Sequence, residues 1–269
     1  MSKLTEKKLF LLDMDGTIYL GDQIFDGTLD FLKWVKDHGG RYMFLTNNSS
    51  KSVDKYVEKL NKLGIKADKK DFATSAQATA LYLLKTHKDD LLYVFGTQAL
   101  KDELKAYGLL VTDKLEDDVK CLVMGFDTEL TFQKLEDACI LLGRGVDYIA
   151  TNPDWVCPTE YGFVPDCGSV ASMLYNATKR NPKFIGKPEP TMIDIAVENS
   201  EFTKEQAILL GDRVYTDIRS GYNAGIDTML MLSGESTVDD LKDFDFSPTY
   251  ICENVRELHT LLVKQSEEE

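Results

Sequence analysis

Short apolar runs, each followed at once by a polar residue, restrict the fold of this chain more than any other feature. The three clearest runs span residues 9–12, 42–45 and 207–210, and the polar residues that follow them are Asp13, Thr46 and Asp212 behind Gly211. Continuous apolar runs of this length are typical of parallel strands that are buried on both faces. Between them lie helix-periodic segments, the clearest at residues 53–63, where Gly64 follows as a stop signal. Strand alternates with helix, which predicts an α/β fold with a parallel sheet.

The middle of the chain repeats the same alternation. Strand-like runs stand at residues 91–95, 121–124 and 148–150, and helical stretches stand around residues 76–87, 98–107, 131–143 and 169–180. These elements either extend the first sheet or form a second one. Because no Pro/Gly/Ser-rich linker marks a boundary, periodicity leaves the number of domains open.

Charge and composition exclude several kinds of partner. The formal net charge of −14 is opposite to that of surfaces that bind phosphate backbones, so nucleic acid is not expected as a partner. The polar N-terminus and the shortness of the first apolar run argue against a signal peptide or a membrane span, which predicts a cytoplasmic protein without a membrane partner. The five cysteines lack a Cys-x-x-Cys spacing, and this predicts reduced, mostly buried thiols.

The strand-end residues predict a shared site. In open parallel sheets, ligands bind beyond the carboxyl ends of the strands, where Asp13, Thr46 and Asp212 would meet. Polar residues also follow strands simply because loops are polar, but three with matching chemistry favour a common site. Asp13 and Asp15 repel one another when both are ionised, and that repulsion is relieved either by a divalent cation between them or by holding one of them as a proton donor. With Asp212 as a third carboxylate, hard oxygen ligands favour Mg²⁺.

Two further segments suit an anion. Lys187 lies on a loop stiffened by Pro188 and Pro190, from which it can hold a phosphoryl group. Residues 46–50 gather hydroxyl, amide and backbone N–H donors ahead of the predicted helix. Taken alone, that second segment is better explained as an ordinary helix N-cap.

These motifs together resemble the haloacid dehalogenase superfamily. Its phosphatases carry Asp-x-Asp-Gly-Thr, a strand-end Thr or Ser, a Lys and Gly-Asp-x-x-x-x-Asp in that order, and here they stand at 13–17, Thr46, Lys187 and 212–217. The stretches Leu-Thr-Asn-Asn, Ala-Thr-Asn-Pro-Asp and Gly-Lys-Pro-Glu-Pro look like the NagD-type and 4-nitrophenylphosphatase branch. The resemblance runs from about residue 8 to residue 255, and an ordered set of motifs is far more specific than any one of them.

The resemblance implies a fold and a division of the chain. It predicts a Rossmann-like, doubly wound parallel-sheet core at residues 1–77 and 181–269, with an inserted α/β cap at residues 78–180. It also allows a homo-oligomer that associates through the cap.

The resemblance also implies a role for each site residue. Asp13 would attack phosphorus, while Asp15 would protonate the leaving oxygen and later activate water. Mg²⁺ would be held by Asp13, the backbone carbonyl of Asp15 and Asp212. The transferring oxygens would be held by Thr46, the backbone of Asn47 and Lys187, and Asp217 would orient Lys187 or a metal-bound water.

The expected activity is a phosphomonoester hydrolase for small substrates such as sugar phosphates, nucleoside monophosphates or aryl phosphates. A phosphotransferase or mutase with the same intermediate and a non-catalytic phosphate-sensing module are the alternatives; a binder has no need of Asp15. Cys157 stands where vitamin B6 phosphatases of this branch carry a histidine, which weakens pyridoxal phosphate as the substrate. Aromatic side chains nearby either stack on a ring or, more commonly, pack within the cap: Trp155, Tyr161 and Phe163.

Overall fold

The computed structural model describes residues 3–159 and 162–268, which form two compact units. The first contains the chain up to Thr46, Val57–Ala73, and the chain from Lys187 onward, and the second contains Asn47–Tyr56 and Thr74–Gly186. The sequence-based boundaries at 77/78 and 180/181 stay predictions. The structural boundaries fall at 73/74 and 186/187, and residues 47–56 join the second unit.

A six-stranded sheet forms the centre of the first unit, in the order β15-β14-β13-β1-β4-β5. Its strands are β1 (Leu9–Leu12), β4 (Arg41–Thr46), β5 (Phe72–Thr74), β13 (Ala207–Gly211), β14 (Asp227–Met231) and β15 (Tyr250–Cys252). β1 pairs in parallel with β4 and β13, and β13 and β14 continue the parallel order towards β15. Every residue of β1 and β13 is buried, as expected for strands covered on both faces.

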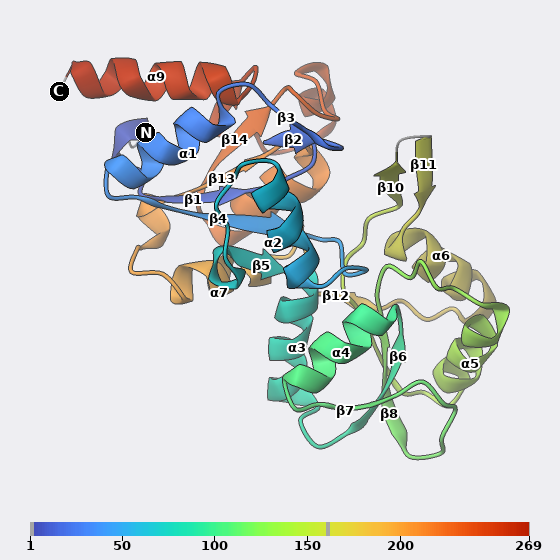
Figure 1. Cartoon of the computed structure of the whole chain (residues 1–269). Coiled ribbons are helices and arrows are strands. Elements are labelled where there is room, and N and C mark those ends of the chain that lie inside the picture. The colour runs from blue at the N-terminus through green and yellow to red at the C-terminus, as the bar shows by residue number, and fades with distance from the viewer. Residues whose placement is uncertain (1–2, 160–161, 269) are drawn as a thin grey trace. The chain divides into compact units, whose positions relative to one another are not determined.

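Helices cover both faces of this sheet, so the predicted doubly wound core is confirmed. α1 (Thr28–Asp37) and α9 (Val255–Glu267) pack together on one face, and α7 (Thr191–Glu198) and α8 (Arg219–Ala224) lie over the other (Figure 1). The remaining elements are the hairpin β2 (Tyr19–Leu20) and β3 (Gln23–Ile24) and the short helices η1 (Leu4–Glu6), η2 (Lys69–Asp71), η3 (Lys204–Gln206), η4 (Val214–Ile218) and η5 (Asp239–Asp243). α2 (Val53–Lys62) begins in the second unit and ends in the first.

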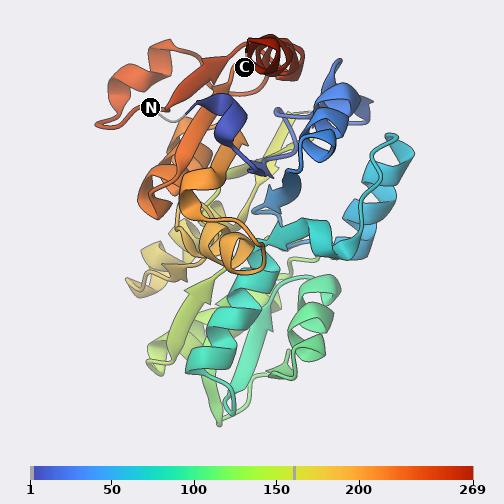
Figure 2. The ribbon, with the colours of Figure 1, turned by 90° about the vertical axis from the view of Figure 1, so that its left-hand side faces the viewer.

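The second unit has its own parallel sheet, in the order β12-β9-β8-β6-β7, so the middle elements do not extend the first sheet. Its strands are β6 (Leu91–Phe95), β7 (Leu110–Thr112), β8 (Val119–Met124), β9 (Asp147–Ala150) and β12 (Lys183–Phe184). α3 (Ser75–Thr86) and α4 (Gln98–Ala106) cover one face, and α5 (Phe132–Gly143) and α6 (Cys167–Thr178) cover the other (Figure 2). A hairpin of β10 (Val156–Thr159) and β11 (Gly162–Pro165) precedes α6.

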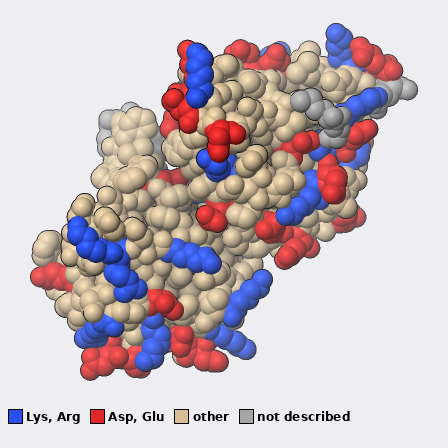
Figure 3. Space-filling model, turned by 180° about the vertical axis from the view of Figure 1, so that it is seen from behind, with Lys and Arg blue, Asp and Glu red and all other residues tan. Residues whose placement is uncertain are grey.

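Charged side chains of both signs lie on the face of the molecule that Figure 3 draws. On the face drawn in Figure 3, acidic and basic side chains alternate among uncharged ones. Across residues 3–159 and 162–268, no helix is both long and apolar enough to cross a membrane.

Candidate active site

The register of the first sheet sets the spacing of the strand-end residues. Leu12 pairs with Phe44 on one side and with Leu210 on the other, so Asp13 lies level with the residues that precede Thr46 and Asp212. The backbone N–H of Asp13 donates to the carbonyl of Leu210 at 2.9 Å, which continues the pairing beyond β1. Thr46 and Asp212 therefore lie one residue beyond the level of Asp13, and the three strand ends open at one edge of the sheet.

Lys187 joins two carboxylates of this edge. Its Nζ donates to Asp13 Oδ1 and to Asp217 Oδ1, each at 2.6 Å, and its side chain is 3% exposed. The loop that carries Lys187 is held by α8, because Ser220 Oγ donates to the Glu189 carbonyl at 3.0 Å and Asn223 Nδ2 to the Pro188 carbonyl at 2.9 Å. These two bonds anchor the Lys187 loop to α8.

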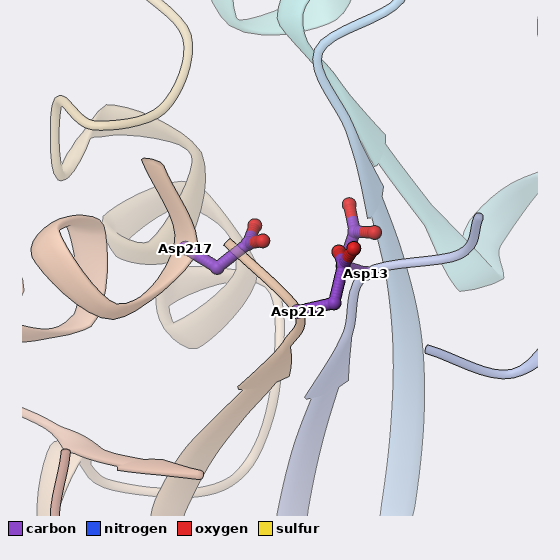
Figure 4. A group of neighbouring side chains, drawn as sticks. All are labelled: Asp13, Asp212 and Asp217. Atoms are coloured by element: carbon purple, nitrogen blue, oxygen red, sulfur yellow. The ribbon is translucent and has the colours of Figure 1, made fainter. Parts of the chain in front are cut away.

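Asp217 faces Asp13 and Asp212 from η4 (Figure 4). Its second oxygen accepts the backbone N–H of Arg213 at 3.1 Å, so both of its oxygens have partners. Gly211 lets this carboxylate come so close to β13, because a Cβ at that position would overlap the Asp217 side chain. Both oxygens of Asp217 thus help to orient protein donors.

Burial and mutual repulsion shift the ionisation of the site. Burial raises the pKa of Asp13 to about 8; Lys187 opposes this shift, and the carboxylates of Asp217 and Asp212 add to it. Burial and Asp217 raise the pKa of Asp212 to about 6. Burial alone would lower the pKa of Lys187, but Asp13 and Asp217 raise it above its ordinary value. The ammonium therefore stays charged, while a pKa of about 8 means that Asp13 needs more positive charge nearby to ionise fully at neutral pH.

The site fits a divalent metal. Asp13, Asp212 and Asp217 each offer an oxygen, and these oxygens lie within 4.8 Å of one another. Asp212 is 2% exposed, and its Oδ1 is buried without a hydrogen-bond partner among the described residues. A buried carboxylate oxygen left without a donor is costly, and a cation supplies the missing interaction.

Asp15 lies outside this cluster of carboxylates. Its side chain is 44% exposed, and its Oδ2 is 3.9 Å from Nζ of Lys59, which also lies 4.0 Å from the centre of the Tyr19 ring. Gly16, at φ 87°, turns the chain between Asp15 and the hairpin of β2 and β3. The structure therefore separates two acids that stand only two positions apart in the sequence.

The comparisons with known proteins agree with this geometry. A haloacid dehalogenase-like hydrolase model matches residues 10–110, and a HAD-hydrolase-like model matches residues 184–258. An acid sugar phosphatase of Staphylococcus haemolyticus is 37% identical over 243 residues, which are 90% of this chain and 92% of that protein. The structure of 4-nitrophenylphosphatase from Thermotoga maritima matches with a TM-score of 0.91 and 39% identity, over 96% of this chain and 98% of that one. The chain belongs to the haloacid dehalogenase-like hydrolases.

Within that family it is a phosphatase of the NagD-like, 4-nitrophenylphosphatase branch. A glycerol phosphate phosphatase from Mycobacterium tuberculosis, solved in complex with calcium, also shares its fold, with a TM-score of 0.88, 33% identity and coverage of 94% of this chain and 75% of that one. The family and the enzyme class that the motifs predict are therefore confirmed.

The remaining predicted residues of the phosphatase lie at the edge of this site or in the second unit. Thr46 ends β4 and is buried, whereas Asn47 belongs to the second unit. There the Asn47 side-chain amide donates to Asp154 at 3.3 Å, and its carbonyl accepts from Ser75 Oγ at 2.6 Å. Asn47 is held rigidly, and its contact with substrate stays a prediction.

Two of the aromatic side chains near Cys157 are largely exposed rather than packed inside the second unit. Trp155 is 58% exposed and Phe163 is 68% exposed. Tyr161 lies outside the described residues. The hairpin of β10 and β11 therefore displays ring surface to solvent.

Sequence reasoning gave no role to three residues that contact the site: Arg213, Gly234 and Glu235. Arg213 donates from Nε to Glu235 at 2.8 Å, and the nearby carboxylates raise its pKa against the effect of burial. The motif around Asp212 includes Arg213, but spacing alone does not show what its guanidinium contacts. Gly234 and Glu235 follow a different strand, in a loop without a recognisable pattern.

Proposed function

We propose that this phosphatase is a Mg²⁺-dependent phosphomonoester hydrolase that acts through a phosphorylated Asp13. The observation that carries the proposal is the pairing of Asp13 with Lys187 at 2.6 Å, near the buried Oδ1 of Asp212, which has no hydrogen-bond partner within residues 3–159 and 162–268. A carboxylate attacks a phosphate ester only where nearby positive charge offsets repulsion between the anions. The site supplies one such charge in Lys187 and the oxygen ligands for a second.

The reaction divides into two displacements. In the first, an Asp13 oxygen forms a bond to phosphorus while the ester oxygen leaves with a proton from Asp15. In the second, Asp15 takes a proton from water, whose oxygen attacks phosphorus, so that inorganic phosphate departs and Asp13 is regenerated. The exposed carboxylate of Asp15 favours this role, because a proton donor must reach the leaving group and then exchange with water.

The other residues hold the groups that react. Mg²⁺, when bound by Asp13, Asp212 and the carbonyl of Asp15, supplies positive charge against the transferring oxygens. Lys187 and Thr46 bind those oxygens, together with the backbone of Asn47. Asp217 keeps the Lys187 ammonium directed at Asp13, since its own oxygens are both in use.

The substrate proposed is a small phosphorylated metabolite. The relatives include a sugar phosphatase, a glycerol phosphate phosphatase and a nitrophenylphosphatase, which supports sugar or polyol phosphates and artificial aryl phosphates as substrates. Nucleoside monophosphates are a further proposed class. The cytoplasmic location, the absence of a nucleic-acid or membrane partner and an association through the cap stay predictions.

Replacing the nucleophile tests the proposal. Asp13→Asn should lower the release of 4-nitrophenol from 4-nitrophenyl phosphate by about a thousandfold or more, since the amide is not a nucleophile. Asp22→Asn, which changes an exposed acid of the same region, is the matched control and should keep full activity. Full activity of Asp13→Asn, or equal wild-type activity with Mg²⁺ and with EDTA, would refute the proposed mechanism.

Product analysis separates hydrolysis from transfer. With an alcohol such as glycerol added as acceptor, a hydrolase should release one inorganic phosphate for each nitrophenol. A clear shortfall of phosphate would identify a phosphotransferase instead.

A further inference from the structure

The loop after β14, residues 233–236, contacts the site but contains none of the motifs. We infer that this loop, named here the strap, holds the Asp212 carboxylate in the orientation needed to bind a divalent cation, with Gly234 and Glu235 as positioning residues. The inference rests on the proposed metal site. It adds residues that the motifs do not contain.

Two backbone N–H groups of the strap hold Asp212, one at its side chain and one at its backbone carbonyl. The N–H of Glu235 donates to Asp212 Oδ2 at 2.7 Å, and the N–H of Ser236 donates to the Asp212 carbonyl at 3.0 Å. One carboxylate oxygen is therefore fixed by the strap, and Oδ1 is the oxygen that has no partner in the part of the chain that the structure describes. This arrangement selects which oxygen faces a cation.

Two glycines enclose the same carboxylate. A Cβ on Gly16 would lie 2.5 Å from Asp212 Oδ2, and a Cβ on Gly234 would overlap that oxygen. The Cα of Gly234 also lies 3.2 Å from the Cβ position of Gly16, so the two backbones approach one another across Asp212. Any side chain at position 234 must displace either the carboxylate or the strap.

The strap also ties together the loops that carry the reacting groups. Ser233 Oγ donates to the Gly16 carbonyl at 2.8 Å, in the loop that follows Asp13 and Asp15. The Glu235 side chain accepts from Arg213 Nε at 2.8 Å and from the Tyr215 hydroxyl at 3.1 Å, in the segment between Asp212 and Asp217. Ligand loops from separate strands are thus connected through a third one.

Groups that orient a metal ligand affect metal affinity strongly. Loss of such a partner typically weakens metal binding by about 10–100-fold, because the ligand must then be ordered when the metal binds. Gly234 and Glu235 are both exposed, so the strap lies at the surface. Loss of one of its contacts should therefore change the global stability of the protein much less than it changes metal affinity. A variant that binds metal more weakly but keeps its thermal stability therefore indicates a positioning role, whereas a merely structural role would lower the stability as well.

Calorimetric titration with Mg²⁺ in the absence of substrate tests the inference. Gly234→Ala should weaken Mg²⁺ binding by about 10–100-fold. The matched control is Gly143→Ala, at the end of α5, where an added Cβ would meet nothing within 4 Å. This control should bind Mg²⁺ as the wild type does.

A milder variant decides the matter if Gly234→Ala fails to fold. Ser233→Ala removes only the bond to Gly16 and should weaken Mg²⁺ binding by about two- to tenfold. Its control is Ser200→Ala, which also removes hydroxyl hydrogen bonds, here to the Val197 carbonyl and to the backbone N–H and carbonyl of Phe202, and should bind Mg²⁺ as the wild type does. Wild-type affinity in a folded Gly234→Ala protein, or in Ser233→Ala where that protein is unfolded, would overturn the inference. A wild-type protein that binds no Mg²⁺ would instead show that the proposed function itself is wrong.

Discussion

Lys187 depends on Asp217 for its direction, because one buried ammonium is shared between two carboxylates. Asp217→Asn keeps the shape of the side chain but removes the charge, so Lys187 should lose its fixed position opposite Asp13. We expect kcat for 4-nitrophenyl phosphate to fall about tenfold or more. Asp194→Asn, which breaks a half-exposed pair with Lys204, is the matched control and should leave kcat unchanged. Equal kcat values for the two variants would contradict the role of Asp217.

Because Asp13 and Asp212 ionise as pH rises, the amount by which Mg²⁺ stabilises the protein should depend on pH. Their pKa values in the folded protein, about 8 and about 6, lie above those of an unfolded chain, near 4. The folded state therefore holds protons that the unfolded state releases, and the stability of EDTA-treated protein should fall as pH rises from 4 to 8. Mg²⁺ replaces those protons, so the gain in melting temperature from Mg²⁺ over EDTA should be larger at pH 8 than at pH 5.5. Equal gains at both pH values would contradict this assignment.

At the scale of elements, β1 places the nucleophile, and its burial makes the sheet rigid at that point. Leu11 is fully buried in β1. Leu11→Ala should therefore lower the free energy of unfolding by about 2–5 kcal/mol in urea titration. Leu29→Ala in α1, where the side chain is 47% exposed, should cost less than about 1 kcal/mol. Equal losses would mean that β1 does not form part of the cooperative core.

Elements and motifs were predictable from the sequence to different degrees. Apolar runs predicted β1, β4 and β13, and helical periodicity predicted α2. Both patterns arise because the side chains that face the core must be apolar. The strap was not predictable, since it acts through backbone N–H groups and through the absence of a Cβ at Gly234. The junction inside α2 was also hidden, because a continuous helix keeps one period across it.

At the scale of the whole molecule, the rates at which the cysteine thiols react show how readily the interior of the second unit opens. Cys121 and Cys167 lie in its buried interior, and burial raises the pKa of Cys121 to about 12. Cys139 and Cys157 are partly exposed. An aromatic disulfide reagent should therefore modify Cys139 and Cys157 at least about tenfold faster than Cys121 and Cys167, as measured by peptide mass spectrometry. Similar rates for all four would show that the interior opens readily.

The order of strands in the first sheet has a consequence for biosynthesis. β1 lies between β4 and β13, but β13 begins at Ala207, almost two hundred residues later. A ribosome that has completed the N-terminal half therefore presents β1 with one of its edges unpaired. Lys187 and Asp212 are also still to be made at that stage, so the nascent chain gains its catalytic potential only during the last third of translation.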